Sequence, residues 1–259
     1  MDLGIRGRKA IVCGGSKGLG FGSAEKLAEA GVDIVLAARS QAPLEQAAGE
    51  IAERYGVTVV PVACDVTTAE GRAALLDAMP APDILINNAG GPPPGMWHEW
   101  GEEEWQAAIR SNMLAPIHLM TAVLPGMIER RWGRIVNITS GSVKAPIAQL
   151  GLSGAARSGL TGFVANTARQ VARDGVTINN LLPGTHETAR IEALMSHTAR
   201  SKGITMDEAR AQLCAANPTG RIGTIEEFGA ACAFLCSQYA GYIVGQNILL
   251  DGGAINATI

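Results

Sequence analysis

The sequence predicts an α/β fold in which helices cover both faces of a doubly wound, seven-stranded parallel sheet. Short, continuous apolar runs alternate along the chain with longer segments whose apolar residues recur at three- and four-residue steps. The short runs are typical of buried parallel strands, and the longer segments are typical of amphipathic helices. No linker, internal repeat or low-complexity tract divides the chain, so we expect one domain over residues 1–259.

The first half of the chain contains the strongest periodic signals. The helix predicted at residues 43–55 places apolar residues on one face, and the helix predicted at 68–79 begins at a threonine, a common N-terminal cap. Strands are predicted at residues 9–12, 33–37, 58–63 and 84–87, and helices at residues 21–30, 43–55 and 68–79.

The second half begins after a glycine- and proline-rich loop at residues 91–95. A long helix is predicted at about 102–131, where Pro116 and Pro125 should bend or break the regular pattern because proline lacks a backbone N–H. An alanine- and glycine-rich helix at 151–173 should pack closely against a neighbour. The remaining strands are predicted at residues 134–138, 177–182 and 246–250.

Composition argues against several classes of function. Basic and acidic residues number 21 and 24, and no basic block marks a nucleic-acid surface. The apolar runs are too short to span a bilayer, and the start of the chain lacks the apolar core of a signal peptide. The five cysteines lack metal-ligand spacing, and Cys232 and Cys236 should pack as small apolar residues on one helical face. We therefore expect a cytoplasmic protein that binds no metal, membrane or nucleic acid.

The glycine-rich turn from Gly14 to Gly20 joins the first predicted strand to the first predicted helix. Glycine lets the backbone turn tightly and approach a ligand, and the free N–H groups of the first helical turn attract negative charge. A glycine cluster alone is often only a turn, but here the flanking strand and helix supply the context of a Rossmann-type dinucleotide site. The turn therefore predicts binding of a nucleotide phosphate.

Seven motifs follow one another along almost the whole chain. They are Gly14-x-x-x-Gly18-x-Gly20, Asp65-Val66, Asn87-Asn88-Ala89-Gly90, Asn112, the segment 134–140 that ends in Ser140, Pro183-Gly184 with Thr188, and the segments 242–246 and 251–253. In this order and at this spacing they resemble the short-chain dehydrogenase/reductase family, and within it the 3-oxoacyl-carrier-protein reductase type. Cys13 is a departure, because the family's first motif usually begins with threonine. The resemblance implies a nicotinamide dinucleotide and a small-molecule carbonyl or alcohol substrate.

The resemblance also implies which residues hold the cofactor. They are Gly14, Ser16, Lys17, Gly18, Leu19 and Gly20 in the turn, Asp65 and Val66 at the adenine edge, Asn88, Ala89 and Gly90 along the ribose and the middle of the cofactor, and Pro183, Gly184, His186 and Thr188 near the nicotinamide and the phosphate.

Two cations favour NADP(H) over NAD(H). An acidic residue after the second strand would accept hydrogen bonds from a free ribose 2′-hydroxyl, whereas a 2′-phosphate needs cations. This chain has Arg39 after the second strand and Lys17 inside the glycine turn, and the guanidinium fork suits a phosphate. The alternative is that both are solvated surface charges.

The catalytic pattern departs from the family. By resemblance, Ser140 polarises the substrate oxygen and Asn112 belongs to a water relay. The family's tyrosine and lysine should follow Ser140 by about 13 and 17 residues, where this chain has Ser153 and Arg157. An aliphatic hydroxyl is harder to deprotonate than a phenol, and an arginine does not release its proton, so the usual relay is closed. Arg157 could still grip the nicotinamide ribose and supply a positive field.

Several groups could replace the missing proton donor. Lys144 lies in the loop after Ser140, His186 lies by resemblance beside the nicotinamide, and His98 neighbours three apolar residues at the expected pocket mouth. An ordered water on Ser140 is a further candidate. The competing interpretations are a solvated loop lysine for Lys144 and a cofactor contact alone for His186.

Three functions remain open at this point. The first is an atypical NADP(H)-dependent oxidoreductase that moves hydride between the cofactor and a carbonyl or alcohol. The second is a non-redox lyase or isomerase, and the third is a catalytically weak or inactive cofactor-binding protein. Residues 186–218 match the family's substrate lid, where Arg190 and neighbouring apolar residues suit a partly apolar, anionic substrate. The resemblance implies a homotetramer, with a dimer as the alternative.

Overall fold

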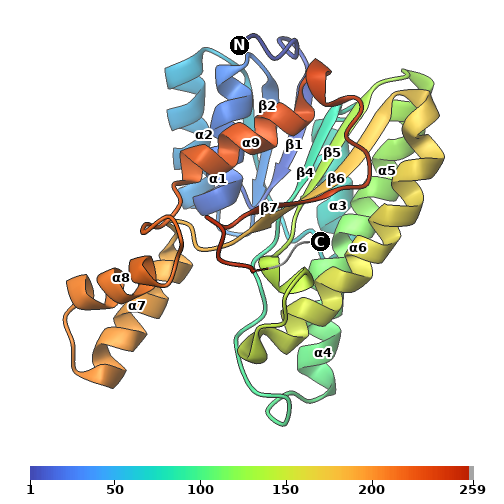
Figure 1. Ribbon diagram of the computed structural model, residues 1–259. Coiled ribbons are helices and arrows are strands. Elements are labelled where there is room, and N and C mark those ends of the chain that lie inside the picture. Colours follow the sequence, from blue (N-terminus) through green and yellow to red (C-terminus); the bar gives the residue numbers. More distant parts are fainter. Residues whose placement is uncertain (257–259) are drawn as a thin grey trace.

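The computed structural model describes residues 1–256 and places a seven-stranded parallel sheet between two layers of helices (Figure 1). The strands are β1 Lys9–Cys13, β2 Asp33–Ala38, β3 Val59–Ala63, β4 Ile84–Asn87, β5 Gly133–Ile138, β6 Val176–Pro183 and β7 Asn247–Leu250. Their order is β3-β2-β1-β4-β5-β6-β7, and every pairing is parallel. The predicted fold class is confirmed, and each predicted strand agrees to within one residue at either end.

The strand order reverses between β1 and β4. Ligands of such sheets bind in the crevice that opens at this point, beyond the carboxyl ends of the strands. The topology therefore brings the segments that follow β1, β4, β5 and β6 to one edge.

Helices cover both faces of the sheet. They are α1 Gly18–Glu29, α2 Gln41–Tyr55, α3 Ala69–Ala78, α4 Glu102–Ile109, α5 Ala115–Glu129, α6 Gly151–Val171, α7 Ala189–Lys202, α8 Met206–Ala215 and α9 Ile225–Cys236. The core under α1, α2 and α9 is separate from the core under α3, α5 and α6. Thr68 caps α3 as predicted, because its hydroxyl oxygen accepts a hydrogen bond from the N–H of Gly71 at 3.0 Å.

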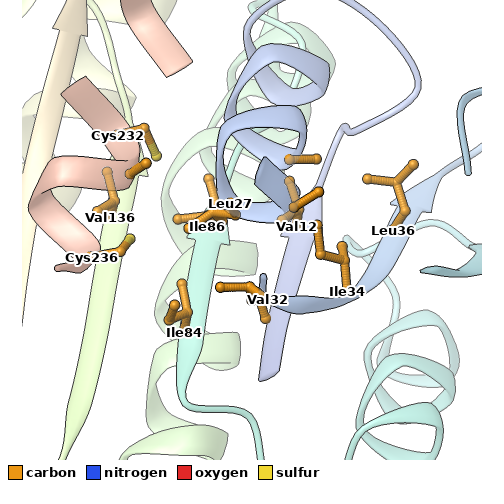
Figure 2. Packing of buried hydrophobic residues seen from close by; sticks show 14 of the residues in the cluster. Val12, Leu27, Val32, Ile34, Leu36, Ile84, Ile86, Val136, Cys232 and Cys236 are labelled. Carbon is orange, nitrogen blue, oxygen red and sulfur yellow. The ribbon is translucent and has the colours of Figure 1, made fainter. Parts of the chain in front are cut away.

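The first core contains Val12 and Val136 from the strands and Cys232 and Cys236 from α9 (Figure 2). Both cysteines are fully buried, which confirms that they pack as small apolar residues. Burial of each large aliphatic side chain contributes about 1.5–3 kcal/mol to the stability of this layer. Helices α1 and α9 meet at Gly22, where an added Cβ atom would lie 2.5 Å from the carbonyl oxygen of Ile225.

The long helix predicted at 102–131 is distorted just before the first proline. A π-helical turn, Arg110–Leu114, joins α4 to α5, and the N–H of Ala115 bonds to the carbonyl of Arg110, five residues back. Pro116 follows in the first turn of α5, and Pro125 lies inside that helix. The π-helical turn accommodates the N–H that Pro116 lacks without ending the helix.

Residues 102–129 form a helical stretch that is long and apolar enough to cross a membrane by length and composition alone. In the structure, 44% of the most apolar 18-residue segment of this stretch is buried. Leu119, Met120, Val123 and Met127 pack in the core under α5 and α6. Packing on the sheet thus accounts for the apolar composition of this side of the helix.

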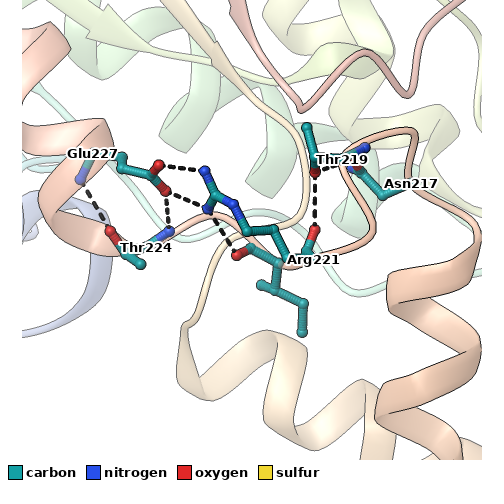
Figure 3. Close-up of polar contacts among 6 residues, drawn as sticks. Asn217, Thr219, Arg221, Thr224 and Glu227 are labelled. Carbon is teal, nitrogen blue, oxygen red and sulfur yellow. Dashed lines mark hydrogen bonds and ion pairs between the residues drawn. The ribbon is translucent and has the colours of Figure 1, made fainter.

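Helices α7 and α8 form a hairpin that projects from the body of the molecule (Figure 1). It has a small core of its own, made by Met195, Ala199, Ala209 and Ile222. The chain returns from the hairpin to α9 through the contacts in Figure 3, in which the Arg221 guanidinium donates to both carboxylate oxygens of Glu227 at 2.7 and 2.5 Å. The hydrogen bonds from Arg221, with a smaller effect of the one from the N–H of Thr224, lower the pKa of Glu227 to about 2.

Candidate functional site

The turn between β1 and α1 has the backbone geometry of an anion site. Gly14 and Gly18 both have a φ of 60°, in the left-handed region that favours glycine. Gly20 lies against the carbonyl oxygen of Gly14, where no side chain would fit. The first N–H groups of α1 have no partner within the helix, and Lys17 at its N-cap makes no side-chain cap. A pyrophosphate fits this cradle, because free N–H groups and the helix dipole both attract negative charge.

Segments far apart in the sequence close around this turn. The side-chain amide of Asn88, after β4, donates to the carbonyl of Gly14 at 3.3 Å. Thr188, at the start of α7, has its methyl carbon 3.4 Å from where a Cβ atom on Gly18 would lie, and its hydroxyl does not cap the helix. The structure therefore brings the predicted residues Asn88, Gly18 and Thr188 together. Cys13, in the place of the family's threonine, is buried, and burial raises the pKa of its thiol to about 12.

Two positively charged side chains lie where the end of β2 adjoins the glycine turn. Arg39 follows β2 directly and is exposed, as is Lys17 in the turn. The two segments are neighbours in the sheet, where the N–H of Gly15 bonds to the carbonyl of Ala37 at 3.0 Å. Asp65 accepts a hydrogen bond from the N–H of Thr67 at 2.9 Å, and this bond, with a smaller effect of Arg39, holds the pKa of Asp65 below its usual value.

The segment after β6 is held in place by β7. The N–H of Gly184 donates to the carbonyl of Leu250 at 2.8 Å. A Cβ atom on Gly184 would lie 2.6 Å from the Cα of Asp251, so this approach requires glycine. Pro183 and Gly184 thus set where His186 and Thr188 begin the hairpin.

Arg157 is a buried cation held by uncharged oxygens. It is 6% exposed, and its guanidinium donates to the carbonyls of Ile138 at 2.8 Å and Ala89 at 3.4 Å. Its Nε donates to the hydroxyl of Ser153, one helical turn earlier, at 3.1 Å. Burial, with a smaller repulsion from Arg190, lowers the pKa of Arg157 to about 10, so the group stays charged at neutral pH. The predicted pairing of Ser153 and Arg157 on one face of a helix is present.

Ser140 follows β5 and is held by a residue that sequence reasoning missed. Its oxygen accepts hydrogen bonds from the N–H of Ser142 at 3.1 Å and from the hydroxyl of Ser142 at 2.9 Å. Both lone pairs of Ser140 are therefore engaged, and its own proton is the group left to donate. The Ser-Gly-Ser spacing was the signal for this pair, since a serine often closes a turn on the backbone two residues away.

Asn112 lies in the π-helical turn and is 2% exposed. Its amide nitrogen donates to the hydroxyl of Ser111 at 2.7 Å, while its oxygen is buried and makes no hydrogen bond to the protein. A cavity of about 20 Å³ is lined by Asn112, Asn87, Val66, Ala89 and Arg157, among others. The structure thus collects the predicted residues Asn112 and Arg157 beside the segment that follows β4.

The candidate replacement proton donors lie in different surroundings. The ring of His186 packs edge-on against Phe228, with the centroids 5.3 Å apart, and its pKa is lowered chiefly by burial. His186 is therefore uncharged at neutral pH and is not a ready proton source. Lys144 and His98 are both exposed, and His98 packs against the ring of Trp97.

A larger hollow of about 590 Å³ lies between the start of α1 and the α7–α8 hairpin. Gly18, Thr188, Ile191 and Met195 are among its lining residues. Ser140, Ser153 and Arg157 do not line it. The hollow therefore adjoins the glycine turn rather than the hydroxyls of Ser140 and Ser153.

Comparison with known proteins identifies the family. A family model described as enoyl-(acyl carrier protein) reductase matches residues 14–255. The chain is 36% identical to a 3-oxoacyl-[acyl-carrier-protein] reductase of Vibrio cholerae over 257 residues, which are 97% of this chain and 98% of the relative. It is 32% identical to a D-beta-hydroxybutyrate dehydrogenase of Cupriavidus necator over 258 residues, which are 96% and 98% of the two chains.

The fold is also that of solved reductases. An L-sorbose reductase from Gluconobacter frateurii, complexed with NADPH and L-sorbose, matches with a TM-score of 0.95 and 30% identity over 99% of this chain and 100% of that chain. The chain therefore belongs to the short-chain dehydrogenase/reductase family of oxidoreductases, with 3-oxoacyl-carrier-protein reductases among its relatives, as the seven motifs predicted.

Proposed function

We propose that this protein is an NADP(H)-dependent oxidoreductase that moves hydride between the cofactor and a carbonyl or alcohol, at a site where Ser153 and Arg157 replace the usual tyrosine and lysine. The observation that carries the cofactor choice is Arg39, which follows β2 where an NAD-specific site would have an acidic residue. The structurally similar L-sorbose reductase, which is complexed with NADPH, supports the same choice.

Different segments of the chain bind different parts of the cofactor. The N-terminus of α1 holds the pyrophosphate, with Asn88 and Thr188 beside it, while Arg39 and Lys17 bind the 2′-phosphate. Asp65 and Val66 contact the adenine, and Ala89, Gly90 and Pro183 to His186 follow the ribose and the nicotinamide. When bound, the nicotinamide supplies or accepts the hydride.

Two serine hydroxyls orient the substrate oxygen. The proton of Ser140 is free to donate because both lone pairs of that oxygen accept from Ser142. The oxygen of Ser153 accepts from the Arg157 cation, which makes the Ser153 hydroxyl a better donor. The positive field of Arg157 also favours negative charge on the reacting oxygen. The final proton comes through these hydroxyls or water, so turnover should be slower than with a tyrosine.

The proposal extends to the organisation of the protein. We take residues 1–259 as one domain, of which residues 257–259 lie outside the described part of the chain. Residues 186–218 act as the substrate lid, and Arg190 favours a substrate that carries negative charge. The protein is a cytoplasmic homotetramer, as the family resemblance implies. Light scattering on the purified protein measures the number of subunits.

The cofactor part is tested by fluorescence titration with NADPH and NADH. NADPH should bind more tightly, and Arg39→Asp should weaken NADPH by about tenfold or more, because it removes a charge-assisted hydrogen bond. Arg200→Asp, at an exposed position on α7, is the control and should leave both affinities unchanged. Tighter binding of NADH than of NADPH to the natural chain would overturn the cofactor assignment.

The reaction is tested at high enzyme concentration with NADPH and a panel of 3-oxoacyl thioesters and ketoses. Slow oxidation of NADPH with at least one of them is the expected result. The double change Ser153→Tyr with Arg157→Lys should then raise the rate, because it supplies a tunable phenol and an amine. Loss of an existing activity in that variant would instead show that Ser153 and Arg157 have a mechanism of their own.

A second function, cofactor binding without turnover, is favoured by where the tyrosines lie. Tyr55 bonds to the carboxylate of Glu25, Tyr239 and Tyr242 are exposed, and none of the three lines the cavity beside Arg157. Tight NADPH binding with no turnover on any panel substrate would select this second function.

A further inference from the structure

Four asparagines form a side-chain ladder across the sheet, besides the hydrogen bonds of the strands themselves. Asn87, Asn137, Asn180 and Asn247 are register partners on β4, β5, β6 and β7. The amide nitrogen of each donates to the amide oxygen of the next, at 2.9, 3.1 and 2.7 Å. The middle two residues are 1% and 0% exposed, so the ladder runs through the interior.

All the amides of the ladder point the same way. Because each nitrogen donates toward β7, each oxygen faces toward β4, and the amide dipoles add along the chain of hydrogen bonds. The negative end is the oxygen of Asn87, which is buried and accepts no hydrogen bond from the protein. Asn87 lines the same cavity of about 20 Å³ as Arg157. Amides turned the other way would place an N–H group, rather than an oxygen, at the cavity that Arg157 also lines.

Arg157 needs such a partner. Among residues 1–256 it forms no ion pair with a carboxylate, and its bonds go to two carbonyls and one hydroxyl. The nearby Arg190 adds repulsion. A buried charge without compensation is strongly unfavourable, so the surroundings must supply negative potential.

We propose that the asparagine ladder supplies the negative potential that allows Arg157 to remain buried and charged. Asn137, Asn180 and Asn247 are then positioning residues that act through Asn87 over the breadth of four strands. The ladder lies on the sheet face covered by α5 and α6, the helix that carries Arg157. The inference goes beyond the proposed reaction and does not depend on it, because its readout is unfolding rather than turnover.

A double-mutant cycle tests the coupling. Asn180→Leu breaks the ladder with a side chain of similar size, and Arg157→Met removes the charge. The cost of the hydrogen bonds that Asn180→Leu leaves unmade is present with either residue at 157, so it cancels in the cycle. Urea unfolding of the natural chain, both single variants and the double variant gives the unfolding constants. We expect Asn180→Leu to raise the unfolding constant about fivefold more when Arg157 is present than when it is methionine.

Asn179 provides a matched control. It adjoins Asn180 in the chain and is equally buried, but its amide bonds to the carbonyl of Ile243 and the N–H of Gln246, outside the ladder. Asn179→Leu should combine additively with Arg157→Met, to within about twofold. Additivity of Asn180→Leu to the same degree would overturn the proposal.

A milder variant covers the case in which Asn180→Leu does not fold. Asn247→Leu lies at the half-buried outer end and removes only one hydrogen bond of the ladder. Its expected coupling to Arg157→Met is about threefold. Additive effects of Asn247→Leu and Arg157→Met would then count against the proposal in the same way.

Discussion

The glycine turn after β1 and the start of α6 lie at the same edge of the sheet, but they depend on the sequence in different ways. The turn works through backbone: left-handed glycines, free N–H groups and a carbonyl that excludes any side chain at position 20. The α6 side works through particular side chains, and we propose that two of them, Ser153 and Arg157, stand where the family has tyrosine and lysine. We therefore expect the glycine turn to keep binding the phosphates of the cofactor when substitutions on α6 change proton transfer, so that the two halves of the site can diverge separately.

The largest effect should come from Gly20→Val, which breaks the backbone half. Its Cβ atom would meet the carbonyl oxygen and carbon of Gly14, and this backbone cannot move without opening the turn. We expect NADPH affinity to fall by about 100-fold or more, since several hydrogen bonds to the phosphates are lost together. Fluorescence titration measures the loss. Gly49→Ala, which meets no atom within 4 Å on α2, is the control, and an unchanged affinity in Gly20→Val would refute the role of the turn.

A smaller and different effect is expected on the side-chain half. Ser140→Ala removes a donor aimed at the substrate oxygen and should lower kcat about 100-fold, with unchanged NADPH affinity. Ser142→Ala removes the hydroxyl that donates to the oxygen of Ser140, so that this oxygen accepts one hydrogen bond instead of two. This variant should lower kcat about tenfold. Steady-state kinetics and NADPH titration on both variants measure the split. A parallel fall in NADPH affinity would show that the two halves are not separable.

The smallest effect concerns the segment that returns the chain from the α7–α8 hairpin to α9, beside the glycine-turn half. The folded-state pKa of Glu227 is about 2, below its ordinary value of 4.5, so its contribution is fully present above pH 4.5 and is lost as the pH falls toward 2. Cleavage by pepsin within residues 217–224 should therefore accelerate across this range. After correction for pepsin's own pH dependence with an unfolded substrate, Glu227→Gln should show no remaining acceleration, whereas Glu192→Gln, at an exposed position on α7, should keep it.

The sequence predicted what depends on local pattern. The apolar runs predicted the strand ends to within one residue, and Thr68 predicted the N-terminal cap of α3. The glycine spacing predicted the turn after β1. The surroundings of Arg157 could not be predicted, because its partners come from β5 and from the segment after β4. The ladder joins asparagines that are 50, 43 and 67 residues apart, so it appears only once the strand register is known.

The π-helical turn at Arg110–Leu114 has a consequence for insertions and deletions. Such a turn arises when one extra residue is accommodated inside an α-helix. Deleting one residue there would rotate α4 relative to α5 by about 100°, the angle per residue of an α-helix. Asn112 would leave the cavity, whereas Leu119 and Met127 would still pack in the core on the sheet. The extra residue therefore lets the helix aim Asn112 at the site without changing the packing of α5.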